Sequence, residues 1–229
     1  MKNLIASIAI MFITVFTVQS QTCKAYIPYQ EGTKLEITSY DKKGKITGID
    51  KQELTKVSES GNTTSFVMHH SNCDKKGEEL FNGDLKYKCK DNVFYVDMSG
   101  FVNSEQMEAY KDMDVKVTMD EIDIPADLSV GQKLKDGSVK MDISGNSPVN
   151  LSFVVNVENR KVEAKESVTT EAGTFDCVKI SQDIITKSMM SFKISSVEWY
   201  AEGVGVVKTE TYRKGKLMGS SKLTKLERP

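Results

Sequence analysis

The chain has 229 residues, a formal net charge of −1 and 39% hydrophobic residues. This balance excludes a disordered chain, which combines low hydrophobicity with high net charge. It also excludes a membrane protein with several helical spans, because a single apolar stretch is long enough to consider. With 31 basic and 32 acidic residues, the sequence has no electrostatic footprint for binding nucleic acid.

Residues 1–20 have the layout of a secretory signal peptide. Lys2 supplies a positively charged start, Leu4–Val18 form an apolar run, and the residues up to Ser20 resemble a cleavage site. The apolar run is shorter than the roughly 20 residues of a membrane span. The sequence therefore predicts export, cleavage after Ser20 and no stable transmembrane anchor.

The rest of the chain, residues 21–229, is expected to form a single β-rich domain. Its predicted location is the periplasm, the cell exterior or the outer-membrane surface. A lipid attached at Cys23 is disfavoured, because Gln21 and Thr22 are not the small residues that such a site needs.

Most of this domain alternates apolar and polar residues with a period of two, which is typical of half-buried strands. The run 151–158 shows the pattern clearly, and 34–38 and 190–195 repeat it. Asp-Lys-Lys-Gly occurs twice, at 41–44 and 74–77, as a turn between extended segments. We therefore expect a mainly β fold, with an antiparallel curved sheet or an open half-barrel.

One segment departs from this period. Asn103–Gln106 resembles a helix capping box, and Met107, Tyr110 and Met113 then recur every third residue. The sequence predicts one short helix near 104–112. An extended linker is expected to follow at 123–127, because Pro125 disfavours helix at the preceding residue.

The chain also carries a sign of internal duplication. Glu-Gly-Thr-Lys-Leu at 31–35 resembles Val-Gly-Gln-Lys-Leu at 130–134, and each begins a series of expected strands. Each series later reaches an aromatic pair, Phe94-Tyr95 or Trp199-Tyr200. These similarities predict two pseudo-repeated halves, 24–100 and 128–227.

Four cysteines remain for an exported protein, which enters a compartment that permits disulfides. Four cysteines allow three pairings, and the sequence alone does not choose among them. A zinc site is disfavoured because there is no Cys-x-x-Cys pair. One or two disulfides are expected, with free buried thiols as the alternative, among Cys23, Cys73, Cys89 and Cys177.

Residues for catalysis are scarce. His69 and His70 are the only histidines, and neighbours on a strand point to opposite faces, so they cannot jointly hold a metal unless a bulge intervenes. There is no Gly-x-Ser-x-Gly motif. Gly203-Val204-Gly205 precedes an expected strand rather than the helix of a dinucleotide site, and is typical of a hairpin turn. The sequence therefore predicts a non-enzymatic protein with no catalytic residue, metal or cofactor.

Methionine and aromatic residues gather around the expected helix and in the later strands. Thioethers adapt to irregular apolar shapes, so these residues would either fill a sheet core or line a cavity for a lipid-like ligand. The candidate lining residues are Met107, Tyr110, Met141, Phe153, Met190, Phe192 and Trp199.

Two sequence motifs carry a family resemblance: Gly-Thr-Phe-Asp-Cys-Val-Lys-Ile at 173–180 and Glu-Trp-Tyr-Ala-Glu-Gly-Val-Gly-Val-Val-Lys at 198–208. With Tyr-Asp-Lys-Lys-Gly-Lys at 40–45, the chain resembles, from about Cys23 to Leu226, a family of exported bacterial proteins described as domain-of-unknown-function or TapB-like proteins. The resemblance implies an exported antiparallel β protein with a curved open barrel like those of lipoprotein carriers. It supplies no catalytic residues.

The leading hypothesis is an exported envelope protein that binds an apolar or amphipathic ligand, such as a lipid, inside a β half-barrel. The alternative is a structural or interaction module with an envelope protein as partner and no internal ligand. A hydrolase with unrecognised residues would need His69 or His70 in a cleft beside a carboxylate or a thiol.

Overall fold

The computed structural model describes residues 23–96, 113–144 and 151–229. In these residues it contains thirteen strands, all paired antiparallel, and no helix. The strands are β1 (Lys34–Asp41), β2 (Ile46–Ser60), β3 (Thr63–Asp74), β4 (Glu79–Lys90), β5 (Val93–Val96), β6 (Asp114–Asp120), β7 (Ile122–Pro125), β8 (Gly137–Ser144), β9 (Leu151–Thr170), β10 (Gly173–Lys187), β11 (Ser191–Ala201), β12 (Gly205–Arg213) and β13 (Lys216–Glu227).

The predicted mainly β fold is confirmed, and the helix expected near 104–112 lies outside the described residues. The segment expected as an extended linker at 123–127 contains most of β7, which pairs with β5. Pro125 is the last residue of this edge strand, a position at which its missing N–H is tolerated.

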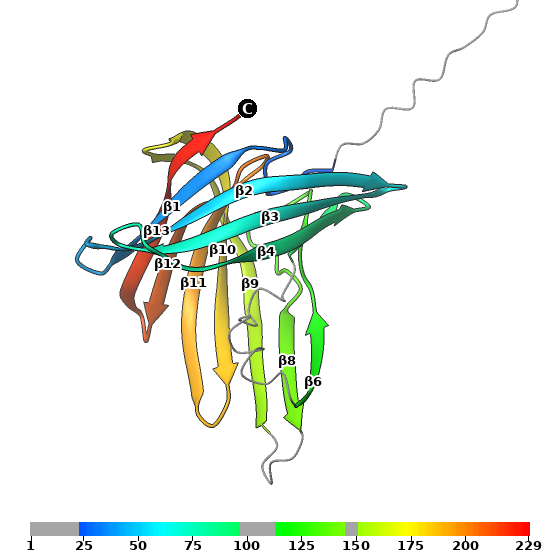
Figure 1. The fold of residues 1–229 in the computed structure, drawn as a ribbon, viewed down its shortest axis with the longest axis vertical. Helices are drawn as coiled ribbons and strands as arrows, with labels where there is room; N and C mark the ends of the chain where they lie inside the picture. Colours follow the sequence, from blue (N-terminus) through cyan, green and yellow to red (C-terminus); the bar gives the residue numbers. More distant parts are fainter. Residues whose placement is uncertain (1–22, 97–112, 145–150) are drawn as a thin grey trace, which may run out of the picture.

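All thirteen strands belong to one sheet, in the order β6-β8-β9-β10-β11-β12-β13-β1-β2-β3-β4-β5-β7. Only Glu121 separates β6 from β7 along the chain, although these strands lie at the two ends of the order. The chain therefore brings the two edges of the sheet together, and the sheet is nearly closed into a barrel (Figure 1).

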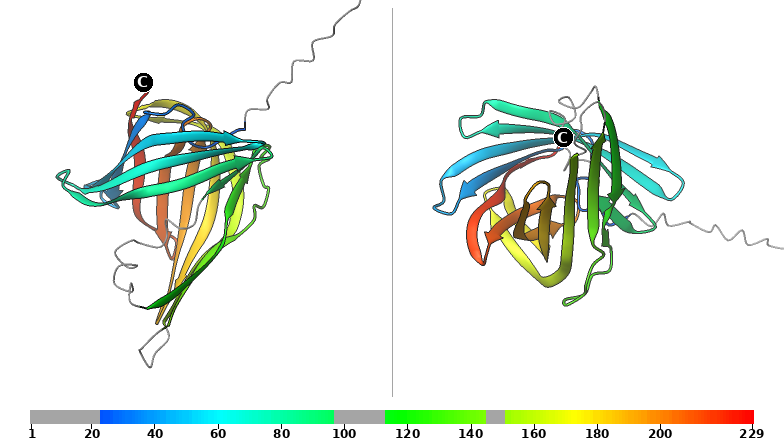
Figure 2. Two further views of the ribbon diagram at one scale, coloured as in Figure 1. Left: turned by 45° about the vertical axis from the view of Figure 1, so that its right-hand side comes forward. Right: turned by 90° about the horizontal axis from the view of Figure 1, so that it is seen from below.

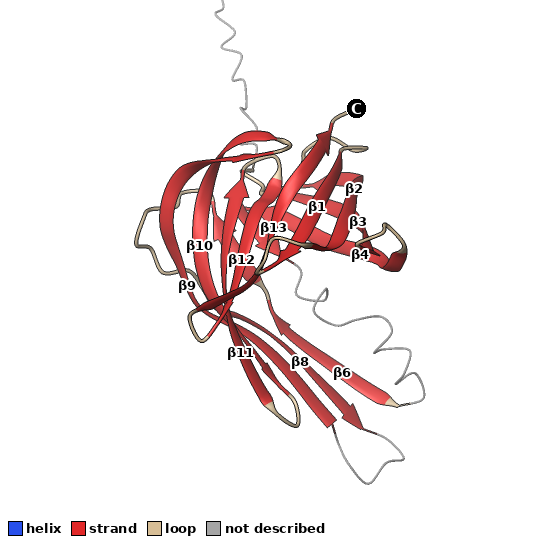
Figure 3. Cartoon of the chain, turned by 90° about the vertical axis from the view of Figure 1, so that its left-hand side faces the viewer, coloured by secondary structure: helices blue, strands red, loops and turns tan. Residues whose placement is uncertain are grey.

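The barrel is covered at one end and extended at the other. Strands β1 to β4 cross over the upper part, while β6 and β8 to β11 continue downward as a wall (Figures 1 and 2). Figure 3 shows this wall running well past the strands that cover the barrel.

The core lies between the inner faces of β1–β4 and those of β9–β13. Leu35, Leu54 and Phe66 from the first group are fully buried against a second group that includes Val162 and Ile180. The segment before β1 completes this core through Ala25, Tyr26 and Ile27. Burial of these apolar side chains is the main term that stabilises the barrel.

The predicted hairpin turns form as expected. In both Asp-Lys-Lys-Gly turns, the Asp carboxylate accepts hydrogen bonds from the backbone N–H groups two and four residues later. The glycines, Gly44 and Gly77, have φ of 78° and 87°, in the left-handed region that favours glycine. Asp91 and Asn92 also have positive φ, as a tight β4–β5 hairpin requires.

The two segments expected to begin the pseudo-repeats share a hydrogen-bonding pattern. The turn at Gly32 exchanges backbone hydrogen bonds with Leu54 of β2, and the turn at Gly131 does the same with Val162 of β9. The aromatic pairs do not correspond, because Phe94 lies in the fifth strand of its series and Trp199 in the fourth. Duplication of 24–100 and 128–227 stays a prediction.

Candidate functional site

The extended strands of the barrel share one largely apolar face. Met141 on β8 pairs with Val117 on β6 and with Phe153 on β9. Paired residues of antiparallel strands point to the same side of the sheet, and the next pairs extend this side to Ile184 on β10 and Ile194 on β11. We call this face the inner wall: Val115, Val117, Met119, Val139, Met141, Ile143, Leu151, Phe153, Val155, Val157, Ile184, Phe192 and Ile194.

The inner wall faces the interior of the barrel. Val139 and Val157 pack against Ile122 of β7 and Val96 of β5, which lie at the far end of the sheet order. The polar residues of the same strands point the other way, where Asp142 accepts hydrogen bonds from Lys140 and Ser152. The alternation of the sequence therefore separates an apolar inside from a charged outside.

Burial along the inner wall decreases toward β6 and toward the free end of β11. Val139, Met141 and Ile143 are buried, whereas Met119 is 44% exposed and Phe192 is similarly exposed. Apolar side chains are thus accessible at this end of the barrel without a fully closed core around them.

The structure places three of the seven candidate lining residues on the inner wall: Met141, Phe153 and Phe192. Met190 lies in the β10–β11 turn and is 82% exposed. Trp199 lies on the opposite face of the sheet, in register with Lys179 and Lys208. Met107 and Tyr110 lie outside the described residues.

Trp199 belongs to the main hydrophobic cluster and also contacts charged side chains on the face opposite to the inner wall. The ammonium groups of Lys179 and Lys208 lie 4.8 and 4.3 Å from its ring centroid, and its indole N–H donates to Glu166 at 2.6 Å. Only 3% of Trp199 is exposed. Cation–π contacts of this kind stabilise by about 0.5–1 kcal/mol at exposed sites. Trp199 is therefore a packing residue that lies away from the inner wall.

Arg160 of β9 holds the two ends of the sheet together and is 1% exposed. Its Nη1 donates to the carbonyl oxygens of Asp123 on β7, at 2.9 Å, and of Lys135 just before β8, at 2.7 Å. Its Nε donates to Gln182 at 3.4 Å. Burial lowers the pKa of Arg160, but a guanidinium stays charged at neutral pH.

This arginine was not among the residues expected to matter. The sequence feature that could have singled out Arg160 is composition, because only three of the 31 basic residues are arginine. Arginine offers a planar set of donors that lysine lacks. An isolated arginine in a lysine-rich chain therefore indicates a position where several acceptors must be satisfied at once.

The polar network continues from Arg160 along the inner face. Gln182 donates to Glu198 at 3.0 Å, and the hydroxyl groups of Ser196 and Tyr200 donate to the same carboxylate. Burial and the Glu198 carboxylate together raise the pKa of Tyr200 well above its usual value. These groups provide hydrogen-bond partners for one another, so we interpret the network as a structural connection between strands above the inner wall.

The two histidines point to opposite faces, as expected from their adjacency. His69 Nδ1 pairs with Asp84 at 2.8 Å, and His70 Nδ1 pairs with Asp50 at 3.2 Å. Ser71 donates to Glu79 at 2.5 Å, so its hydroxyl is not arranged as a nucleophile activated by a histidine. In the described parts of the chain, no cluster of three His, Cys, Asp or Glu side chains could hold a metal.

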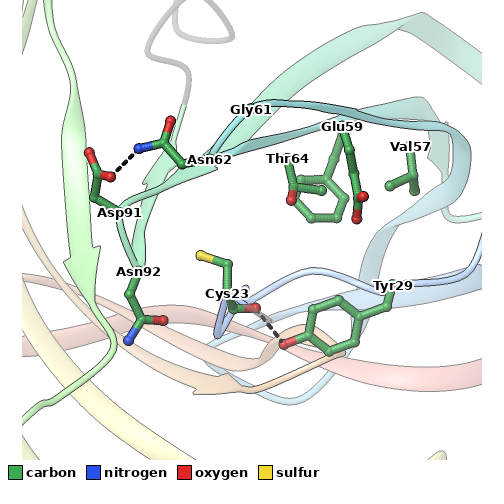
Figure 4. Close-up of a pocket in the computed structure, with 10 residues that line it drawn as sticks. Cys23, Tyr29, Val57, Glu59, Gly61, Asn62, Thr64, Asp91 and Asn92 are labelled. Atoms are coloured by element: carbon green, nitrogen blue, oxygen red, sulfur yellow. Dashed lines mark hydrogen bonds between the residues drawn. The ribbon is translucent and has the colours of Figure 1, made fainter. Parts of the chain in front are cut away.

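A pocket of about 580 Å³ lies at the end of the β2–β3 hairpin (Figure 4). Tyr29 donates to the carbonyl oxygen of Cys23 at 3.3 Å, and Asn62 donates to Asp91 across the mouth. The lining includes a second carboxylate, Glu59, and no cationic side chain. It shares no residue with the inner wall, and its lining combines polar groups with apolar side chains such as Val57 and Phe66.

One disulfide joins Cys23 to Cys89, with Cα atoms 6.1 Å apart. This distance fits ordinary disulfide geometry. Cys73 and Cys177 are free and buried.

Alkylation provides a direct check on the thiols. At pH 8 the folded protein is expected to resist iodoacetamide, because both free cysteines are buried and burial raises the pKa of Cys177 to about 11. Unfolding without a reductant should expose two reactive thiols, and unfolding with a reductant should expose four, as counted by intact mass. Labelling of all four without a reductant would contradict the disulfide.

Across 23–96, 113–144 and 151–229, no helix has the length and hydropathy required to cross a membrane.

Comparison with known proteins adds a family and a shared fold. A family model described as DUF3108-like matches residues 30–223. The chain is similar to the solved structure of a Bacteroides fragilis protein described as exported with a YmcC-like fold, at 23% sequence identity and a TM-score of 0.72. It is also similar to that of a Parabacteroides distasonis protein described as a lipoprotein, at 25% sequence identity and a TM-score of 0.74. Each alignment covers 90% of this chain and 100% of the other. A search of curated proteins finds no significant match. The expected domain-of-unknown-function family is confirmed, and the narrower TapB-like resemblance stays a prediction.

Proposed function

Because this chain belongs to the DUF3108-like family and is similar in fold to proteins described as exported, we propose that it is an exported envelope protein that binds an amphipathic ligand on its inner wall. The observation that carries the proposal is the apolar face shared by five neighbouring strands, β6 and β8 to β11, which Thr186 alone interrupts between Val155 and Phe192. The protein acts by binding and not by catalysis.

The dimensions and chemistry of the inner wall favour a ligand with an apolar tail. From Leu151 to Val157 the wall extends along β9 for roughly 20 Å, at about 3.3 Å per residue. At its free end the guanidinium of Arg213 lies 4.6 Å from the ring of Phe192. A tail along the wall would leave an anionic headgroup within reach of this cation.

Native mass spectrometry of the exported protein tests the proposal. The protein would be expressed with its own signal sequence and measured before and after solvent extraction. We expect an adduct of lipid size that extraction removes. A bare mass that matches 21–229 with one disulfide, and that stays unchanged when lipids are added, would overturn the proposal.

A lysine in the inner wall should weaken binding of an amphipathic probe. We expect Met119→Lys to raise the Kd for the fluorescent dye anilinonaphthalene sulfonate about tenfold, because a charge placed in an apolar site must be desolvated. Thr118→Lys is the matched control, since Thr118 pairs with Lys140 on the opposite face of β6. Equal Kd values for the two variants would place the dye elsewhere.

A second function is favoured by the edge position of β6. This strand begins the sheet order, so among the described strands it pairs only with β8. An exposed edge can accept an extended segment of another protein as an added strand. A structural or interaction module in the envelope is therefore the alternative, and it predicts capture of a protein partner with no extractable ligand.

A further inference from the structure

Two neighbouring hairpins at the free end of the barrel expose large apolar side chains. Met189 in the β10–β11 turn is 93% exposed, and Met190 beside it is nearly as exposed. The backbone N–H of Ser188 donates to the carbonyl of Met190 at 3.1 Å, and this closes the turn with both methionines outside. Leu217 and Met218 are exposed at the start of β13. We call residues 187–193 and 213–218 the hairpin rim.

The two hairpins form one surface. Strand β11 pairs with β12, and their pairing runs as far as Ser195 and Tyr212, near the end of β12 and four residues into β11. The guanidinium of Arg213 lies over the ring of Phe192 at 4.6 Å, which joins the two tips directly. Figure 1 shows both hairpins directed toward the free end, away from the strands that cover the barrel.

The hairpin rim is basic and contains no acidic residue. Its five cations are Lys187, Lys193, Arg213, Lys214 and Lys216, of which Lys193 pairs with Asp183 outside the rim at 2.9 Å. The whole chain, by contrast, has a net charge of −1. The Asp-Lys-Lys-Gly turns differ, because each contains an aspartate that caps its own backbone. The rim therefore combines exposed methionines with a concentrated positive charge that the other basic turns lack.

This combination matches a membrane interface. Apolar side chains enter the boundary between headgroups and acyl chains, while lysine and arginine are attracted to anionic headgroups. Methionine is flexible and adapts to an irregular apolar environment. We propose that the hairpin rim docks the protein on a lipid surface that carries anionic headgroups, with Met189 and Met190 inserted and the cations on the phosphates.

The docking goes beyond the proposed function and can hold without it. Phe192 belongs to both the hairpin rim and the inner wall, so a docked protein would present the free end of its apolar face to the bilayer. A ligand with an acyl tail would then reach the wall without crossing open water.

Co-sedimentation with vesicles tests the docking. The exported protein would be mixed with vesicles of phosphatidylcholine alone or with about 30% phosphatidylglycerol. We expect binding to the anionic vesicles only, and loss of binding at about 0.5 M salt because the charges are exposed. Equal binding to both vesicle types, or none to either, would overturn the proposal.

Matched variants separate insertion from charge. Met189→Ser with Met190→Ser should weaken vesicle binding at least about tenfold, because apolar area no longer enters the interface. Leu80→Ser with Val130→Ser removes two apolar side chains that are also largely exposed, at 67% and 63%, and should change nothing. Equal losses in both pairs would overturn the assignment to the rim.

A second pair of variants tests the cations. Lys187→Ser with Lys214→Ser should weaken binding to anionic vesicles, whereas Lys42→Ser with Lys75→Ser removes the same charge from the Asp-Lys-Lys-Gly turns and should not.

Met119→Lys is expected to keep vesicle binding while losing binding of the dye, and the variant with Met189→Ser and Met190→Ser should keep binding of the dye. Failure of docking is thereby distinguished from failure of ligand binding.

Discussion

Replacing Arg160 with methionine is expected to lower the free energy of unfolding by about 2–4 kcal/mol. The carbonyl oxygens of Asp123 and Lys135 would each lose their charged donor, and an unsatisfied buried group costs about 1–3 kcal/mol. Methionine fills much of the vacated volume, so the decrease in the free energy of unfolding comes mainly from the lost hydrogen bonds. The side chain matters because it connects β9 to β7, at the far end of the sheet order, and to the segment just before β8.

Urea unfolding followed by the fluorescence of Trp199, the single tryptophan, measures this effect. Lys161→Met is the control on the neighbouring residue: it removes a surface ion pair with Glu163 at 3.0 Å, which is worth about 1 kcal/mol or less. Equal losses for the two variants would show that Arg160 does not connect the sheet ends.

Arg160→Lys should be intermediate between the parent and Arg160→Met. Lysine keeps the charge, but it is a single flexible ammonium without the planar donor set of arginine. It can therefore reach one carbonyl without also reaching Gln182. A lysine variant as stable as the parent would mean that charge alone is required at this position.

The strands and turns were predictable because their causes are local. Alternation along 151–158 depends only on the two faces of a strand, and the Asp-Lys-Lys-Gly turns cap their own backbone. Phe153 could be assigned to an apolar face from its own strand. The pairing of Phe153 with Met141 could not, because it depends on the register between β8 and β9.

The position of Trp199 shows where local patterning fails. A strand places Trp199 and Tyr200 on opposite faces, but the pattern does not say which face is inside. Large aromatic residues are usually interior, which favoured Trp199 as a lining residue. Trp199 is instead buried on the other face, within the main hydrophobic cluster and beneath lysines from β10 and β12. That arrangement depends on two registers that the sequence does not reveal.

Arg160 illustrates the same limit for polar groups. Its two carbonyl acceptors lie 37 and 25 residues away in the chain. No local motif links these positions. The backbone at Asn159 has φ of 57°, and the pairing of β9 with β10 shifts nearby. An interrupted strand of this kind redirects a side chain, and alternation alone would not predict the new direction.

Reduction of the disulfide between Cys23 and Cys89 is the second change with a large expected effect. The bond closes a loop with a sequence separation of 66, for which chain entropy gives a stabilisation of about 4 kcal/mol, and typical values are about 2–4 kcal/mol. It also holds the segment that places Tyr26 against Phe94 and Tyr200. We therefore expect a reductant to lower the midpoint of urea unfolding markedly.

Paired substitutions separate the disulfide from thiol packing. Cys23→Ser with Cys89→Ser should reproduce the loss and make stability insensitive to reductant. Cys73→Ala with Cys177→Ala should cost less and keep the full sensitivity, because these thiols are free. If the second pair abolished the sensitivity instead, the bond would have to lie between Cys73 and Cys177. Cys23 would then be free to carry a lipid, and its neighbourhood would have to be interpreted as an anchor site.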